Sequence, residues 1–276
     1  WPTFNGDLMA QKYSTATQIT PPHVHHHPVA WKVHTGDFSK GKGKIPESYF
    51  EATPIFVNNT VYISTPFYRV YALAPDTGKT KWLFDPHATL KPLTQPGMKS
   101  RGVAYWQSAK PAPAQPCQKI VYVGTMTAQL YAIDADTGEA CTGFGKSGVL
   151  DIDQWNTAKG TWPLSILQPP TVYKNTLIIG WGGKDWAIGH HAPAGNVFGV
   201  DAQTGALKWT FNVLPPEAVA NSGTANVWAS MSVDPKTGIV YLPVSSPSPN
   251  YWGGNRKEAL PYATSITALN SDTGKV

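Results

Sequence analysis

A short turn motif occurs four times along this chain, and its period restricts the possible fold more than any other feature. Each copy consists of an apolar run, the turn Asp-Thr-Gly (Gln-Thr-Gly in the third copy) and a second run. The turn glycines recur at intervals of 60, 67 and 69 residues, at Gly78, Gly138, Gly205 and Gly274. Glycine readily adopts the positive φ of a hairpin turn, and the preceding Asp, Gln or Thr can hydrogen-bond the turn backbone. Each copy therefore predicts a β-hairpin between two half-buried strands.

Another pair of apolar runs precedes the hairpins. In three of the modules these runs flank the turn candidates 58–59, 174–175 and 234–238. Two hairpins per period give four antiparallel strands, which make one blade of a β-propeller, whereas a parallel solenoid has shorter periods and lacks hairpin turns. The sequence therefore predicts an all-β fold, a β-propeller of four-stranded antiparallel blades, with four blades in residues 1–276.

Tryptophans in a shared register support the propeller. Trp82 and Trp209 stand five residues beyond the turn threonines, and we expect both rings to be buried between neighbouring blades. The second copy has Thr142 at this position, and the fourth stops at Val276 before its tryptophan. Residues 29–33 resemble the final strand of a blade whose earlier strands are missing. Because an incomplete ring leaves unpaired strand edges, we expect a C-terminal portion, or another chain, to complete it.

Composition argues against several other classes of protein. A length of 276 residues with 41% hydrophobic content can bury a sizeable core. The net charge is +5, but only Lys40, Lys42 and Lys44 are closely grouped, and we interpret them as a solvated loop rather than a nucleic-acid site. No apolar run approaches the roughly 20 residues that span a bilayer. Cys117 and Cys141 lack the spacing of a zinc or redox motif and could pair with each other.

A histidine cluster near the N-terminus invites a metal assignment. Its members are His23, His25, His26 and His27. Closely spaced imidazoles can chelate transition metals. The cluster lies between prolines, however, so we favour an exposed loop.

The Asp-x-Thr-Gly-Lys-x-x-Trp repeat resembles the docking motif of pyrroloquinoline quinone (PQQ) dehydrogenases, over essentially the whole chain. Segments 12–14, 51–54, 101–105 and 252–256 are similar to the branch of membrane-bound glucose, quinate and polyol dehydrogenases. The resemblance implies an eight-bladed ring, so that residues 1–276 would be a single, incomplete propeller domain, the N-terminal half. It also implies a Cys117–Cys141 disulfide, which suits an oxidising compartment.

The same resemblance assigns three residues to the cofactor. Trp228 stands where the family has the tryptophan beneath the quinone, Arg101 matches the arginine that reaches the cofactor, and Glu51 matches an acidic residue near it. A flat quinone with three carboxylates needs an aromatic face and cations, which these residue types supply. The alternatives are a core tryptophan for Trp228 and a surface salt bridge for Arg101.

Calcium, which prefers hard oxygen ligands, is the metal that the resemblance implies. Asp185 occupies the position of the family's carboxylate ligand. Ser246 stands where the family contributes an asparagine or threonine oxygen, although a Ser-Pro loop is the simpler interpretation. By analogy the ion polarises the quinone carbonyl while an aspartate, expected beyond Val276, removes the alcohol proton. We therefore expect this chain alone to be inactive.

Gly97 departs from the family pattern. The glucose branch has a histidine here, four residues before the arginine, that covers the upper face of the cofactor. Met98 and Lys99 are the alternatives for that role, although neither offers the same stacking geometry. The departure leaves the choice of substrate open.

The predicted function is PQQ- and calcium-dependent oxidation of a sugar, polyol or related alcohol, with electrons passed to a respiratory quinone. The expected location is the periplasm, with attachment to the inner membrane through a segment absent from this chain. The alternative is a non-catalytic propeller scaffold that binds partner proteins. A scaffold has no reason to gather a stacking ring, a cation and a calcium carboxylate, and we therefore favour the enzyme.

Overall fold

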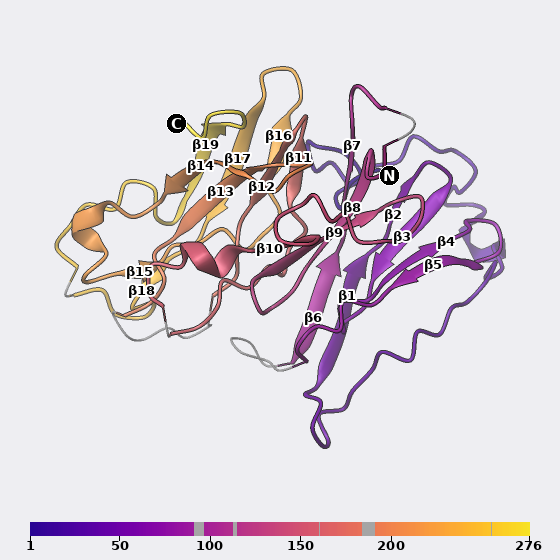
Figure 1. Ribbon diagram of the computed structural model, residues 1–276, viewed down its shortest axis with the longest axis horizontal. Coiled ribbons are helices and arrows are strands. Elements are labelled where there is room, and N and C mark those ends of the chain that lie inside the picture. The colour runs from indigo at the N-terminus through magenta and orange to yellow at the C-terminus, as the bar shows by residue number, and fades with distance from the viewer. Residues whose placement is uncertain (91–96, 113–114, 160, 184–190, 255) are drawn as a thin grey trace.

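The computed structural model describes residues 1–90, 97–112, 115–159, 161–183, 191–254 and 256–276 (Figure 1). Strands dominate it. The helices of the described residues are three short 3-10 segments, η1 (Val24–His26), η2 (Ile152–Trp155) and η3 (Pro216–Ala218). Within these ranges no helix has the length and apolar character needed to cross a bilayer. The predicted all-β class is confirmed.

Three antiparallel four-stranded sheets follow one another along the chain (Figure 1). The first contains β2 (Ile55–Val57), β3 (Thr60–Ser64), β4 (Val70–Leu73) and β5 (Thr80–Phe84). The second contains β7 (Ala104–Gln107), β8 (Lys119–Gly124), β9 (Gln129–Asp134) and β10 (Val149–Asp151). The third contains β11 (Thr171–Tyr173), β12 (Thr176–Ile179), β13 (Asn196–Asp201) and β14 (Leu207–Asn212). Strands pair in chain order within each sheet, as in the propeller blades that the repeat predicts.

The fourth sheet has three strands instead of the predicted four. It contains β16 (Ser232–Asp234), β17 (Ile239–Val244) and β19 (Ser265–Asn270). In the first blade the outer strand begins at Thr80, two residues after the turn glycine Gly78. The corresponding position after Gly274 is Val276, the last residue of the given sequence.

The repeated turns are closed mainly by a side chain that precedes the motif. Asp134, Asp201 and Asn270 each accept hydrogen bonds from the two backbone N–H groups that lie two and three residues later, at 2.9–3.0 Å. The turn threonines add a weaker contact, as in the bond from Glu139 N to Thr137 Oγ1. The prediction that polar side chains close these turns is confirmed, but the residue just before the threonine contributes less than the earlier Asp or Asn.

Indole rings lie between blades, as predicted. Trp31, Trp82 and Trp209 pack against the turn glycines of the following hairpins, where an added Cβ would lie 2.6–2.8 Å from the ring, namely at Gly78, Gly138 and Gly274. Each indole N–H donates to a carbonyl three residues before that glycine, at 2.9–3.1 Å, in Pro75, Ala135 and Ser271. One contact thus fixes both the distance and the register between neighbouring blades.

The junction between the second and third blades uses different residues, because Thr142 replaces the tryptophan. Phe144 packs beside Gly205, with 3.2 Å between its ring and an added Cβ. The hydroxyl of Tyr122 donates to the carbonyl of Ala202, which is the position that an indole contacts elsewhere. Burial raises the pKa of Tyr122 well above its usual value, so this hydroxyl remains a donor.

Substitution of a docking glycine tests this arrangement. We expect Gly138→Ala to lower the free energy of unfolding by about 1–3 kcal/mol more than Gly36→Ala, because overpacking a tight contact costs about that much. Both glycines have positive φ, +82° and +74°, but no atom of the described residues lies within 4 Å of a Cβ added to Gly36. Backbone strain is therefore similar in the two variants. Equal losses of stability in denaturant titrations would show that the indole contact is not tight.

Residues 29–33 do not form the predicted strand. No strand of the described residues pairs with this segment, so its backbone joins no ladder there. Trp31 still makes the docking contact of a final strand. The indole register was therefore the more reliable part of the prediction.

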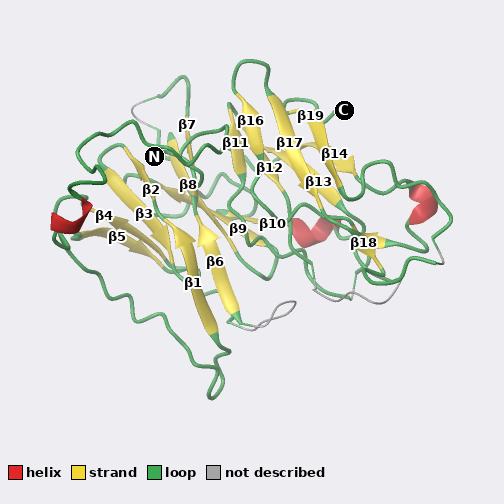
Figure 2. Ribbon diagram, turned by 180° about the vertical axis from the view of Figure 1, so that it is seen from behind, coloured by secondary structure: helices red, strands yellow, loops and turns green. Residues whose placement is uncertain are grey.

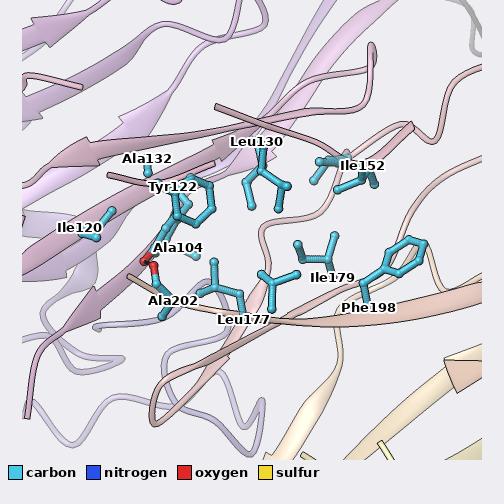
Figure 3. Close-up of a cluster of buried hydrophobic side chains, with 14 of the residues drawn as sticks. Ala104, Ile120, Tyr122, Leu130, Ala132, Ile152, Leu177, Ile179, Phe198 and Ala202 are labelled. Atoms are coloured by element: carbon cyan, nitrogen blue, oxygen red, sulfur yellow. Dashed lines mark hydrogen bonds between the residues drawn. The ribbon is translucent and has the colours of Figure 1, made fainter. Parts of the chain in front are cut away.

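The largest core cluster lies between the second and third blades. Figure 3 shows Tyr122 and Leu130 facing Leu177, Ile179 and Phe198 across this junction. All five side chains are fully buried. Alternation along β8, β9, β12 and β13 places these residues on facing surfaces of the two sheets.

The disulfide between Cys117 and Cys141 is present, as the resemblance implied, with 24 residues of sequence separation. Closing a loop of this length stabilises the fold by about 3 kcal/mol in the chain-entropy description. The bridge ties the loop before β8 to the segment after β9, in the same blade. It lies in the blade that has lost its docking tryptophan.

Two surface interpretations are also confirmed. Lys40, Lys42 and Lys44 are exposed in the loop before the first strand. The side chains of His23, His25 and His27 are exposed in and around η1.

The N-terminal segment crosses the first strands of the blades. The carbonyl of Trp1 accepts a hydrogen bond from Phe56 in β2, and that of Leu8 accepts one from Val233 in β16. Residues 2–5, 7 and 8 also line a small cavity together with residues of β7 and β11. This segment therefore links the inner edges of all four sheets.

Candidate functional site

A two-stranded parallel ribbon forms the base of the candidate site. β1 (Ser48–Thr53) and β6 (Met98–Gly102) pair with Tyr49 opposite Lys99. Figure 2 shows the two strands side by side, each leading into the first strand of a blade. Sequence analysis identified Glu51 and Arg101 separately but did not predict that their strands pair.

Alternation along β6 divides its side chains between two faces. Met98, Ser100 and Gly102 are buried, whereas Lys99 and Arg101 are partly exposed on the other face. The hydroxyl of Ser100 lies 2.8 Å from that of Ser64 in β3, which fixes the buried face to the first blade. One face of the ribbon is thus anchored to the first blade, and the charged side chains lie on the opposite, partly exposed face.

One carboxylate pairs with both cations of the exposed face. Glu51 Oε2 lies 3.3 Å from Arg101 Nε, and Glu51 Oε1 lies 3.5 Å from Lys99 Nζ. Both distances exceed those of short charge-assisted hydrogen bonds, so these are loose ion pairs. Two cations therefore share one carboxylate at the centre of this face.

Trp228 joins this group from the loop between β15 (Gly223–Thr224) and β16. The guanidinium carbon of Arg101 lies 5.3 Å from the centre of its ring, and Arg101 Nη1 donates to its backbone carbonyl at 3.3 Å. The indole is 46% exposed, which excludes the alternative of a core tryptophan. A cation beside an accessible aromatic face is a favourable arrangement for a planar anion.

Hydrogen bonds to buried residues fix the loop that carries Trp228. Asn226 Nδ2 donates to the carbonyl of Trp181 at 2.6 Å, and Ser245 N donates to the carbonyl of Asn226 at 3.0 Å. Asn226 and Trp181 are both buried. The position of the exposed indole is therefore set by the third and fourth blades, while Arg101 comes from the ribbon.

Tyr49 completes the exposed face at its other end. Lys99 Nζ lies 6.0 Å from the centre of the Tyr49 ring, and the phenol donates to Glu47 Oε2 at 2.8 Å. This hydrogen bond raises the pKa of Tyr49. We call Tyr49, Glu51, Lys99, Arg101 and Trp228 the ribbon site.

Sequence reasoning missed Tyr49 and gave Lys99 only as a possible cover for the cofactor. The alternation of β6 places Lys99 on the same face as Arg101, and this signal was available in the sequence. Tyr49 left no comparable signal. Its neighbour across the ribbon lies 50 positions away.

The two proposed calcium ligands have different outcomes. Asp185 lies outside the described residues. Ser246 is exposed; its carbonyl accepts hydrogen bonds from Ala225 N and Thr224 Oγ1, and its hydroxyl lies 3.4 Å from Asn250 Nδ2. Among the residues that the structure describes, no hydrogen bond joins Ser246 directly to the ribbon site.

The described part of the chain contains one group of three potential metal ligands, Cys117, Asp134 and Cys141. Its two thiols form the disulfide, and Asp134 Oδ2 accepts a hydrogen bond from Cys117 N. This group is therefore a structural feature of the second blade and lies apart from the ribbon site in the sequence.

Comparison with known proteins places the whole chain in one family. Residues 1–276 match the family model described as "PQQ: Glucose/ethanol/alcohol dehydrogenase, beta-propeller domain". The chain is 32% identical to quinoprotein glucose dehydrogenase A of Acinetobacter calcoaceticus and 31% identical to the quinate/shikimate dehydrogenase (quinone) of Acinetobacter baylyi. Both alignments cover all of this chain, but only 37% and 36% of the relatives.

Solved structures agree with the fold. A quinohemoprotein alcohol dehydrogenase of Pseudomonas putida superposes with a TM-score of 0.75 at 26% identity, over 100% of this chain and 39% of that structure. The enzyme of the same description from Comamonas testosteroni gives a TM-score of 0.75 at 26% identity, over 100% and 40%. The chain thus spans less than half of the relatives that it matches. It belongs to the family of PQQ-linked glucose, ethanol and alcohol dehydrogenase β-propeller domains.

Proposed function

We propose that this chain is the N-terminal half of an eight-bladed dehydrogenase that oxidises a sugar, polyol or related alcohol with bound PQQ. The observation that carries the proposal is the ribbon site, where an accessible indole, two cations and a carboxylate meet on a propeller of this family. The extent of the relatives supports the second half, because the chain covers 36–37% of the first two. The remaining blades would follow Val276.

The residues of the ribbon site fit a planar anion. Trp228 would stack on the quinone, while Arg101 and Lys99 would pair with its carboxylates. Glu51 holds both cations side by side and limits their repulsion before the anion arrives. When bound, PQQ would supply the oxidant that takes two electrons from the CH–OH group.

Calcium would be the second cofactor in this proposal, and Asp185 and Ser246 would hold it. Both positions offer oxygen atoms, the ligand type that calcium prefers. The general base, an aspartate, would come from the portion after Val276. The proposed electron acceptor is a respiratory quinone.

A periplasmic location, with attachment to the inner membrane through another segment, completes the proposal. The disulfide between Cys117 and Cys141 supports this location, because disulfides persist in oxidising compartments. Structural disulfides are rare in cytosolic proteins, where thiols are kept reduced.

Titration of the complete protein with PQQ tests the function. The apo-protein is mixed with increasing PQQ, with and without calcium, and binding is followed by the quenching of tryptophan fluorescence. We expect micromolar or tighter binding, and reduction of a dye when glucose, glycerol or quinate is added to the loaded protein. If PQQ does not bind while a partner protein does, the enzyme proposal is wrong and the propeller is a scaffold.

A further inference from the structure

The ribbon site has an aromatic ring at each end, and only one of them has a role so far. Contacts run from the Trp228 ring to Arg101, then to Glu51, to Lys99 and finally to the Tyr49 ring, with successive distances of 5.3, 3.3, 3.5 and 6.0 Å. Both rings therefore have a cation of the site beside them. Both are also accessible, Trp228 at 46% and Tyr49 at 39% exposure.

Gly97 provides the space that the Tyr49 ring occupies. It is buried and has φ +74°, and a Cβ at this position would overlap Tyr49 Cε2 and lie 2.9 Å from the carbonyl of Glu47. That carbonyl accepts a hydrogen bond from Met98 N at 2.6 Å, so the backbone next to the ring has little freedom to move. Any residue other than glycine at position 97 would displace the ring.

The phenol of Tyr49 is held at its outer end. Its hydroxyl donates to Glu47 Oε2 at 2.8 Å. Glu47 and Tyr49 are two residues apart at the start of β1, so their side chains lie on the same side of the strand. The ring is thus held by Gly97 at one edge and by Glu47 at its hydroxyl, and it remains accessible.

We propose that Tyr49 is a second aromatic contact for the bound planar quinone, and that Gly97 is required to seat its ring. This inference rests on the proposed function, because it concerns the same ligand. A ring that is already held in place loses little conformational freedom when a flat ligand packs against it. The arrangement also explains why position 97 carries no side chain that could cover the cofactor.

Binding of PQQ to variants of the complete apo-protein tests the role of Tyr49 without reference to turnover. We expect Tyr49→Leu to raise the dissociation constant about tenfold, since an aromatic contact contributes roughly 1 kcal/mol beyond its area. Tyr49→Phe keeps the ring and is expected to stay within about threefold of the wild type. Phe50→Leu, at the adjacent exposed position on the other side of β1, is the matched control and should leave the constant unchanged.

A double-mutant cycle tests whether Gly97 acts through Tyr49. Gly97→Ala alone is expected to weaken PQQ binding about as much as Tyr49→Leu, because it moves the ring. Added to Tyr49→Leu, it should cause little further loss, whereas independent effects would multiply. Backbone strain from the positive φ is present in both backgrounds and cancels in the cycle.

The outcomes separate this inference from the proposed function. If the wild type binds PQQ and Tyr49→Leu binds it equally well, the role of Tyr49 is wrong while the function stands. Multiplicative losses in the cycle would refute the role of Gly97. If the wild type does not bind PQQ, both proposals fall together.

Discussion

Arg101→Gln in the complete protein is expected to raise the dissociation constant for PQQ about a hundredfold. Arg101 is the residue of the ribbon site that contacts both Glu51 and Trp228, so its loss removes a cation and a constraint on the indole together. Loss of a charge-assisted pair with a carboxylate costs about 1.5–3 kcal/mol, and a hundredfold change corresponds to about 2.7 kcal/mol. The measurement is the same fluorescence titration of the apo-protein.

Two further variants show whether the charge or the planar shape of Arg101 is responsible for the expected loss of affinity. Arg101→Lys keeps the charge but loses the planar fork, and we expect an intermediate loss of about tenfold. Lys174→Gln is the control, because Lys174 also lies over an aromatic ring, 4.9 Å from that of Tyr173, but outside the ribbon site. An Arg101→Gln protein that binds PQQ as tightly as the control would remove Arg101 from the cofactor site.

Salt provides an independent check on the same prediction. If charge carries part of the affinity, the wild-type dissociation constant should rise with ionic strength, because screening weakens attraction between partly exposed groups. The dissociation constant of Arg101→Gln should depend less steeply on ionic strength, because the ribbon site then has one cation instead of two. A salt dependence equal to that of the wild type would indicate that Arg101 acts only by holding Trp228.

Local features of the fold could be predicted because their cause is local. A glycine turn between two alternating runs specifies a hairpin by itself, and the register of Trp82 and Trp209 specifies what lies between blades. Prediction failed where a strand needs a pairing partner that lies far away in the sequence. Residues 29–33 resemble a final strand in sequence, but no strand of the described residues pairs with them.

The site was predictable only in part, for a related reason. β1 and β6 are parallel, so no turn connects them, and their exposed polar residues do not show the apolar pattern of a buried strand. The proximity of Glu51, Arg101 and Trp228 was inferred from a family resemblance, and the structure brings these three together. Tyr49 and the pairing of Lys99 with Glu51 required knowledge of the register between the two strands.

The second large effect concerns the indole between the third and fourth blades. We expect Trp209→Ala to lower the free energy of unfolding by about 3–5 kcal/mol, the usual cost of removing a buried tryptophan. Trp209 is 8% exposed, and its N–H donates to the carbonyl of Ser271. Trp252→Ala, at a ring that is 66% exposed, is the control and should change stability by less than about 0.5 kcal/mol.

Trp82→Ala should cost about 1–2 kcal/mol less than Trp209→Ala, although both rings occupy the same position of the repeat. At the first junction the carbonyl of Ala135 accepts hydrogen bonds from both Trp82 and Tyr62, so it keeps a partner when the indole is removed. At the third junction the carbonyl of Ser271 loses the bond from Trp209. Denaturant titrations of the two variants measure the difference. Equal losses would mean that ring volume, rather than the hydrogen bond to the turn, holds the blades in register.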